Sequence, residues 1–175
     1  MVRRNANHLA VTLLLCLVVV ACGDDGSVGP LADEAGETIL ADLEADAIVR
    51  LVTSDNSFGP EANPFDIVNV GTLIGGDADR PVEPLVPDLT EAALAGSAEI
   101  VFVDDVEALI DDLFEQNVVG AAVASIEDLR IDGERAELDM RLWCGSLCGV
   151  FLTYEAVLTD TGWDILGTTG PIAIS

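Results

Sequence analysis

The stretch from residue 135 to residue 158 constrains the fold most, because apolar and polar side chains alternate along it with a period of two. Such alternation is typical of strands that bury one face and leave the other in water. The apolar positions of the stretch are Ala136, Leu138, Met140, Leu142, Val150, Leu152, Tyr154, Ala156 and Leu158. We therefore predict two antiparallel strands joined by a short loop over residues 145–147.

The same alternation fixes the register of this hairpin. If Cys144 faces Cys148, each cross-strand pair on that face is apolar, whereas a slip of one residue sets apolar side chains against polar ones. Directly opposed residues lie about 4.5–5.5 Å apart, which a disulfide can span. We expect a structural disulfide between Cys144 and Cys148. A redox-active pair and a metal-binding pair are the alternatives.

Other periodicities precede the hairpin. Apolar residues recur every three or four positions within residues 38–53, which predicts an amphipathic helix. Asp46 and Arg50 lie one turn apart on its solvated side, the spacing of a favourable helix ion pair. Runs rich in β-branched residues predict strands at 65–74 and 100–103.

Two further helix starts follow from pairs with capping-box spacing, in which a short polar residue stands three positions before a glutamate. Asp88 with Glu91 predicts a short helix after a loop over residues 75–87. Asp104 with Glu107 predicts an amphipathic helix over the residues that follow. The apolar stripe of this second helix is Val106, Leu109, Ile110, Leu113 and Phe114.

From residue 118 the period changes from helical to two. A strand over residues 118–131 closes at Asp132-Gly133, a dipeptide typical of hairpin turns, and shorter strands are expected at 163–167 and 171–175. Helices therefore come first in the chain and long antiparallel strands last. This order predicts the α+β class, with N-terminal helices packed on a curved antiparallel β-meander.

The first 22 residues form a unit of their own. Two arginines precede the apolar stretch 9–21, which is shorter than the roughly 20 residues of a membrane span and has the pattern of a secretory signal. Val19-Val20-Ala21-Cys22 resembles the lipobox of bacterial lipoproteins. The resemblance implies cleavage before Cys22 and lipid on its sulfur, so that the protein is anchored to the cell membrane on its extracytoplasmic side. It divides the chain into a signal peptide (1–21), a lipidated flexible tether (22–37) and one α+β domain (38–175).

The domain itself resembles two further groups of proteins. Its order of elements, together with the closing turn and strand Asp160–Ile165, is similar to cystatin-like and NTF2-like rolls. The hairpin Cys144–Gly149 with the later Gly162-Trp163 turn resembles exported bacterial proteins of unknown function. Enzymes among the NTF2-like rolls usually place Asp, His or Tyr in the cavity of the roll.

Composition excludes several kinds of chemistry. The mature part keeps five arginines against all 32 acidic residues, a formal charge of −27, which opposes binding to nucleic acid or to anionic lipid headgroups. All basic residues of the chain are arginine, and its single histidine, His8, lies in the signal. The mature protein therefore has no histidine for a Ser-His-Asp arrangement and no lysine for a Schiff base. We expect no catalytic residue, metal ligand or cofactor.

Two sets of residues were considered as binding sites. The carboxylates at Asp77, Asp79, Asp104, Asp105, Glu107, Asp111 and Asp112 lack the spacing of an EF-hand, and we interpret them as caps and solvated faces. The outer side of the predicted hairpin carries an apolar set that is a candidate binding patch, unless another segment of the domain covers it: Trp143, Leu147, Phe151 and Val157.

These observations predict a non-catalytic binding or interaction module, tethered to the membrane through Cys22, whose partner is an envelope protein or a small ligand. The alternative is a roll that binds a small ligand between sheet and helices, with carboxylate-based catalysis. An apolar cavity that contains a buried acid would favour this alternative.

Overall fold

The structure is a computed structural model that describes residues 34–58, 65–75, 80–145 and 148–174. Its elements in chain order are α1 (Glu34–Thr53), β1 (Ile67–Gly71), β2 (Leu73–Ile74), β3 (Arg80–Pro81), α2 (Val86–Leu94), β4 (Glu99–Val103), α3 (Val106–Gln116), β5 (Ala121–Asp132), β6 (Arg135–Gly145), β7 (Cys148–Thr159) and β8 (Gly162–Ile174). No described helix is long and apolar enough to cross a membrane.

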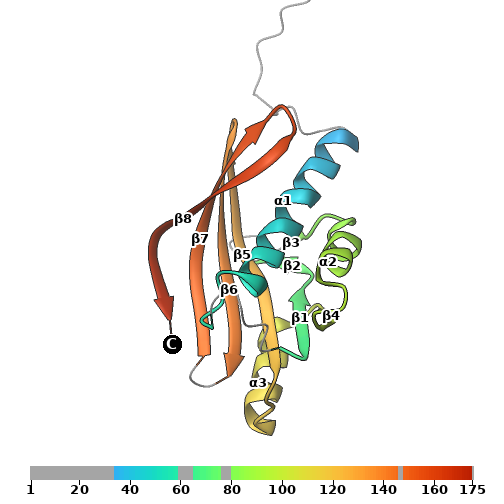
Figure 1. Ribbon diagram of the computed structural model, residues 1–175, viewed down its shortest axis with the longest axis vertical. Helices are drawn as coiled ribbons and strands as arrows, with labels where there is room; N and C mark the ends of the chain where they lie inside the picture. Colours follow the sequence, from blue (N-terminus) through green and yellow to red (C-terminus); the bar gives the residue numbers. More distant parts are fainter. Residues whose placement is uncertain (1–33, 59–64, 76–79, 146–147, 175) are drawn as a thin grey trace, which may run out of the picture.

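The fold is of the α+β class, as predicted. Six strands form one sheet in the order β4-β1-β5-β6-β7-β8, and strands β5 to β8 are a continuous antiparallel meander. Helix α1 crosses one face of this sheet, and the sheet curves around it (Figure 1). We call the face under α1 the inner face and the opposite one the outer face.

The prediction of N-terminal helices on an antiparallel meander is wrong at one edge of the sheet, where the strands are parallel and helices lie between them. Strand β1 pairs in parallel with both β4 and β5, and α2 and α3 alternate with the short strands. Parallel neighbours need a crossover connection, usually a helix. Helix α2 supplies the one from β1 to β4, and α3 the one from β4 back to β5.

The core lies between α1 and the inner face. Leu43, Ala47 and Leu51 of the predicted helical stripe are fully buried in α1. They pack in one cluster with inner-face side chains such as Leu138 and Met140. Burying a leucine contributes about 1.5–3 kcal/mol, so this layer accounts for much of the stability of the domain.

The predicted register of the β6–β7 hairpin is confirmed from Ala136 opposite Ala156 to Leu142 opposite Val150. At the loop end of the hairpin the prediction is wrong by one residue, because Cys148 pairs with Gly145 and Cys144 lies in a bulge. Gly145 has a φ of +130°, a conformation that favours glycine and lets the strand take up the extra residue.

Both capping-box predictions are wrong in detail. Helix α2 starts at Val86 with no side-chain cap, because Pro87 occupies its first turn and provides a preset φ. Asp88 therefore lies inside the helix. In α3 the cap is Asp105 rather than Asp104, and its carboxylate accepts a hydrogen bond of 2.9 Å from the backbone N–H of Ala108.

Candidate functional site

Exposed apolar side chains gather at one end of the domain. Of the ten large hydrophobic residues that the structure shows as exposed, six lie where strands β6 and β7 meet their disulfide-bridged loop: Phe58, Phe114, Val119, Phe151, Ile172 and Ile174. They lie on both faces of the sheet, because Ile174 pairs with the inner-face residue Val150 whereas Phe151, the next residue of β7, points to the outer face. We call this region the disulfide end.

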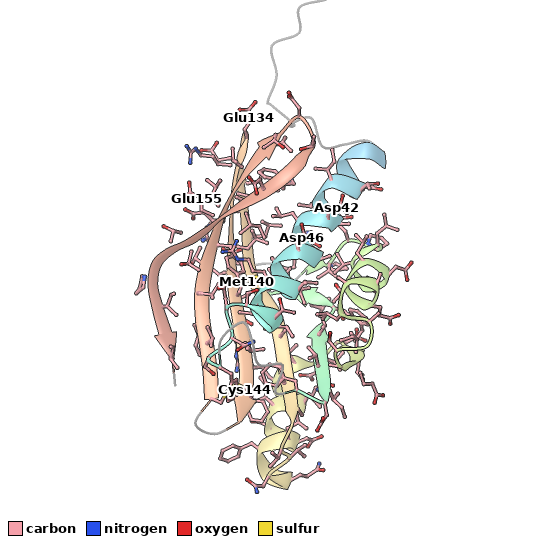
Figure 2. The ribbon with its side chains drawn as sticks, viewed as in Figure 1. Asp42, Asp46, Glu134, Met140, Cys144 and Glu155 are labelled. Carbon is pink, nitrogen blue, oxygen red and sulfur yellow. A yellow bond between two sulfur atoms is a disulfide. The ribbon has the colours of Figure 1, made fainter. Side chains whose placement is uncertain are left out.

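The disulfide end lies opposite the start of α1. In Figure 1, α1 begins at the upper end of the molecule. The lower end contains α3, the C-terminus, the end of β6 and the start of β7. Figure 2 shows Cys144 at the lower end and Glu134, in the β5–β6 turn, at the upper end. Twelve residues of β7 at roughly 3.3 Å each separate the two ends by about 40 Å.

Cys144 and Cys148 form a disulfide with their Cα atoms 5.0 Å apart. The prediction of this bridge is confirmed even though the two residues are not directly paired in the sheet. The hydroxyl of Ser57 lies 3.4 Å from the Cys148 sulfur, so the segment after α1 contacts the bridge. The bridge therefore lies at the loop end of the β6–β7 hairpin and is in contact with a second segment of the chain.

Helix α3 packs on the outer face at this end. Its Ile110 is buried, and the added methyl group that an alanine at Gly71 would bring would lie only 2.9 Å from Val106, so helix and sheet are in close contact. Asn117 adopts a left-handed conformation (φ 50°) and ends the helix. Phe114, predicted as part of the buried stripe, is 60% exposed, because α3 extends beyond the sheet edge that would cover it.

A shallow hollow of about 160 Å³ separates the end of α3 from the hairpin. Its lining residues come from both elements: Leu113, Phe114, Asn117, Val118, Trp143 and Gly145. Trp143 is half-buried here, since α3 covers one side of it. Aromatic side chains at the margin of a pocket are the type that most often anchors a protein partner.

Arg141 of β6 contacts both α3 and the neighbouring strand β7. Its guanidinium donates a hydrogen bond to Glu107 of α3 and lies over the ring of Phe151, 5.7 Å from the ring centre. Phe151 is nevertheless 43% exposed. A short strip of aromatic surface, consisting of Phe114, Trp143 and Phe151, therefore lies along α3 and across β6 and β7.

The candidate patch named from the sequence divides into two parts. Trp143 and Phe151 lie together at the disulfide end. Val157 pairs with Arg135 and lies six residues along the strand from Phe151, about 20 Å away. Leu147 lies outside the described residues. The sequence analysis missed Phe114 and Val119, the latter 88% exposed, because helical periodicity assigned the first to the core and the second has no periodic partner.

The upper part of the outer face is a network of ion pairs. Arg130 contacts the carboxylates of Asp128, Glu137 and Asp139, and Asp139 also accepts a hydrogen bond of 2.6 Å from Thr153. The guanidinium of Arg130 lowers the pKa of Asp139. Among the described residues, each arginine on this part of the outer face therefore has a carboxylate partner.

Two polar clusters in the interior were inspected for catalytic geometry. Glu44 of α1 is fully buried, and its carboxylate accepts hydrogen bonds of 2.8 Å each from Arg80 and from the N–H of Glu83. Burial raises the pKa of Glu44, while the contacts to Glu83 and Arg80 oppose that rise. Glu44 lines none of the four hollows defined by described residues. It connects α1 to the β3 region.

The second cluster joins α1 to the sheet. The buried Tyr154 donates a hydrogen bond of 2.8 Å to Asp55, which also accepts one of 2.9 Å from Arg50. Arg50 therefore pairs with Asp55 and not with Asp46, because the chain turns back after α1 and brings Asp55 beneath the helix end. Burial, and then the contact with Asp55, raises the pKa of Tyr154 above its ordinary range. A neutral, satisfied tyrosine of this kind is structural.

The acidic residues near α3 are engaged in hydrogen bonds or lie in solvent. Asp104 accepts from Thr72, Asp105 caps the helix and Glu107 pairs with Arg141, while Asp111 and Asp112 are exposed. Within the described part of the chain, no group of three or more His, Cys, Asp or Glu is arranged to hold a metal ion. Asp77 and Asp79 lie outside that part.

Comparison with known proteins adds no relative. The sequence matches no protein-family model, and no curated protein or solved structure is significantly similar to it.

Proposed function

We propose that the protein is a lipid-anchored interaction module of the bacterial cell envelope, without catalysis, and that the disulfide end is its binding surface. The observation that carries the proposal is the hollow lined by Phe114 and Trp143, with the exposed Phe151 on the neighbouring strand, at the end of the domain opposite the start of α1. Soluble monomers rarely expose apolar side chains in groups unless these side chains contact something.

The proposed anchor gives this placement a purpose. The predicted tether (22–37) overlaps the first turn of α1, which begins at Glu34, so residues 22–33 are left to connect Cys22 to the helix. A flexible segment of about twelve residues has an r.m.s. reach of about 19 Å. With lipid on Cys22, the upper end of the domain in Figure 1 lies near the bilayer and the disulfide end points away from it. The binding surface is then accessible to proteins of the envelope rather than to lipid.

The fold supports a binding role more than an enzymatic one. As part of the same proposal, we assign the domain to the cystatin-like or NTF2-like rolls, on the packing of α1 against the curved β5–β8 meander; the parallel β4-β1-β5 edge departs from a purely antiparallel roll. The alternative function, a ligand-binding roll with carboxylate chemistry, has less support. The buried acid that it needs, Glu44, is already neutralised by Arg80.

The proposal is tested by purifying the lipidated protein from its own membrane together with bound proteins. We expect a partner to be retained by the unchanged chain and lost with Phe114→Ser. Leu85→Ser is the matched control, since Leu85 is 43% exposed but lies at the N-cap of α2, away from the disulfide end. Equal recovery with both variants contradicts the proposed surface.

The anchor is tested separately. Cys22→Ala should abolish labelling by a clickable fatty acid and block processing before residue 22. Unchanged labelling of this variant contradicts the lipoprotein assignment while leaving the binding surface in place.

A further inference from the structure

The aromatic strip along α3 is bordered by negative charge that nothing in the described structure compensates. Asp111, Asp112 and Glu115 are exposed on α3, and none of them is in a salt bridge of the described residues. All five described arginines are already paired: Arg50, Arg80, Arg130, Arg135 and Arg141. The surface therefore offers apolar contact and anionic charge, with no available cation in the described residues.

The end of α3 strengthens this charge. A helix carries a partial negative charge at its C-terminus, which basic residues in the last turn usually offset. The last turn of α3 has no basic residue, and Asn117, which follows it, lines the hollow beside Trp143. The negative end of the helix dipole is thus directed to the same place as the exposed Phe114.

We infer that the occupant of this hollow is a cationic amphipathic segment of another protein, with apolar side chains against Phe114, Trp143 and Phe151 and basic side chains along the α3 carboxylates. The inference rests on the proposed function and specifies its partner. A second copy of this chain is disfavoured, because two domains of formal charge −27 repel one another. Anionic lipid and nucleic acid are disfavoured for the same reason.

The geometry fits one helix or extended segment rather than a broad flat surface. The hollow is about 160 Å³, enough for one or two side chains. From the hollow the aromatic strip crosses β6 and β7 to Phe151, beside the Arg141–Glu107 pair. Recognition by a short segment with one or two apolar anchors is therefore expected.

The test uses defined peptides and the full mature chain. The probe is an amphipathic peptide with leucine at positions i, i+3, i+4 and i+7 and lysine elsewhere, labelled with fluorescein; the comparison peptide has glutamine in place of every lysine. Dissociation constants are measured by fluorescence anisotropy at physiological ionic strength, where the Debye length is about 8 Å and long-range attraction is largely screened. We expect the lysine peptide to bind about tenfold more tightly than the glutamine peptide.

Two charge-matched variants separate local recognition from general attraction to an acidic protein. The first removes the three carboxylates of α3 with Asp111→Asn, Asp112→Asn and Glu115→Gln. The second removes three exposed carboxylates from α1 and α2, two of them visible in Figure 2, with Asp42→Asn, Asp46→Asn and Glu91→Gln. The first variant should lose most of the preference for the lysine peptide, and the second should keep it.

Phe114→Ser should weaken both peptides by about tenfold or more. Equal loss of lysine preference in the two charge variants, or binding that does not change with Phe114→Ser, overturns the inference. Absence of binding by either peptide overturns it too. These results leave the proposed function standing if the membrane purification still recovers a partner that depends on Phe114, so the two failures are distinguishable.

Discussion

Removal of the disulfide offers a quantitative check on the hairpin. The bridge closes a loop of five residues, Cys144 to Cys148. For a loop of this size, the chain-entropy relation gives about 7 cal/mol/K, or about 2 kcal/mol at 25 °C. The double variant Cys144→Ser, Cys148→Ser should therefore fold, with a free energy of unfolding lower by about 2 kcal/mol.

The same change can be expressed as a melting temperature. Unfolding entropy of about 2.1 cal/mol/K per residue gives about 0.3 kcal/mol/K for a domain of roughly 140 residues. A loss of about 2 kcal/mol then lowers the melting temperature by about 7 °C. The assay is thermal and urea unfolding of the lipidated protein in detergent, followed by circular dichroism.

A reductant provides the control. It should lower the stability of the unchanged hairpin by the same amount and leave the double Ser variant unaffected. Two alkylatable thiols in freshly isolated protein, or a variant as stable as the parent, would refute the reasoning from loop closure. Failure of the variant to fold would show that the bridge stabilises more of the domain than the loop between β6 and β7.

Leu43→Ala should cost about 2–5 kcal/mol, as for a large core truncation, measured by urea unfolding. Tyr154→Phe should cost about 1 kcal/mol through loss of the hydrogen bond to Asp55. Because burial raises the pKa of Tyr154, the only tyrosine of the chain, absorbance at 295 nm should show no tyrosinate near pH 10 until the domain unfolds. The Arg130 guanidinium lowers the pKa of Asp139 below its ordinary value of 3.8, which stabilises the fold above that pH. This contribution is lost as pH falls through the folded pKa, so Asp139→Asn should make stability depend less on pH in the acid range. Added NaCl should raise the melting temperature by screening like charges, and millimolar Ca²⁺ should do no more than NaCl of equal ionic strength.

The sequence was most informative where one physical pattern determined the structure. The β6–β7 register could be predicted because a slip of one residue would have exposed every apolar side chain of the face. The β5–β6 turn, which lies at Gly133-Glu134, one residue after the predicted Asp132-Gly133, and the buried stripe of α1 were predictable for comparable reasons. Each depends on residues close together in the chain.

Features that depend on distant residues could not be derived in this way. Nothing in the short apolar run of β1 indicates that it pairs in parallel with strands beginning at Glu99 and Ala121. The bulge at Cys144 depends on Gly145, which the alternation pattern ignores. Glu44 did carry a signal, since it lies four residues before Ile48 on the apolar side of α1, but its partner Arg80 could not be identified from spacing.

The candidate binding surface could likewise be predicted only in part from the sequence. Trp143 and Phe151 were identifiable because they fall on the outer face of a strand whose register was known. Phe114 was not, because helical periodicity gives the direction of a side chain but not the length of sheet available to cover it. Its exposure depends on where α3 ends relative to β5 and β6.

The most direct test of the account is a crosslink from the disulfide end in the native envelope. A photoreactive phenylalanine analogue is introduced at position 114 in the lipidated chain, and at position 85, an exposed hydrophobic position at the N-cap of α2, as a control. We predict a discrete adduct from position 114 that is absent from position 85 and is lost when the α3 carboxylates are neutralised. Equal adducts from both positions, or none from position 114, would contradict the assignment of this end as the binding surface.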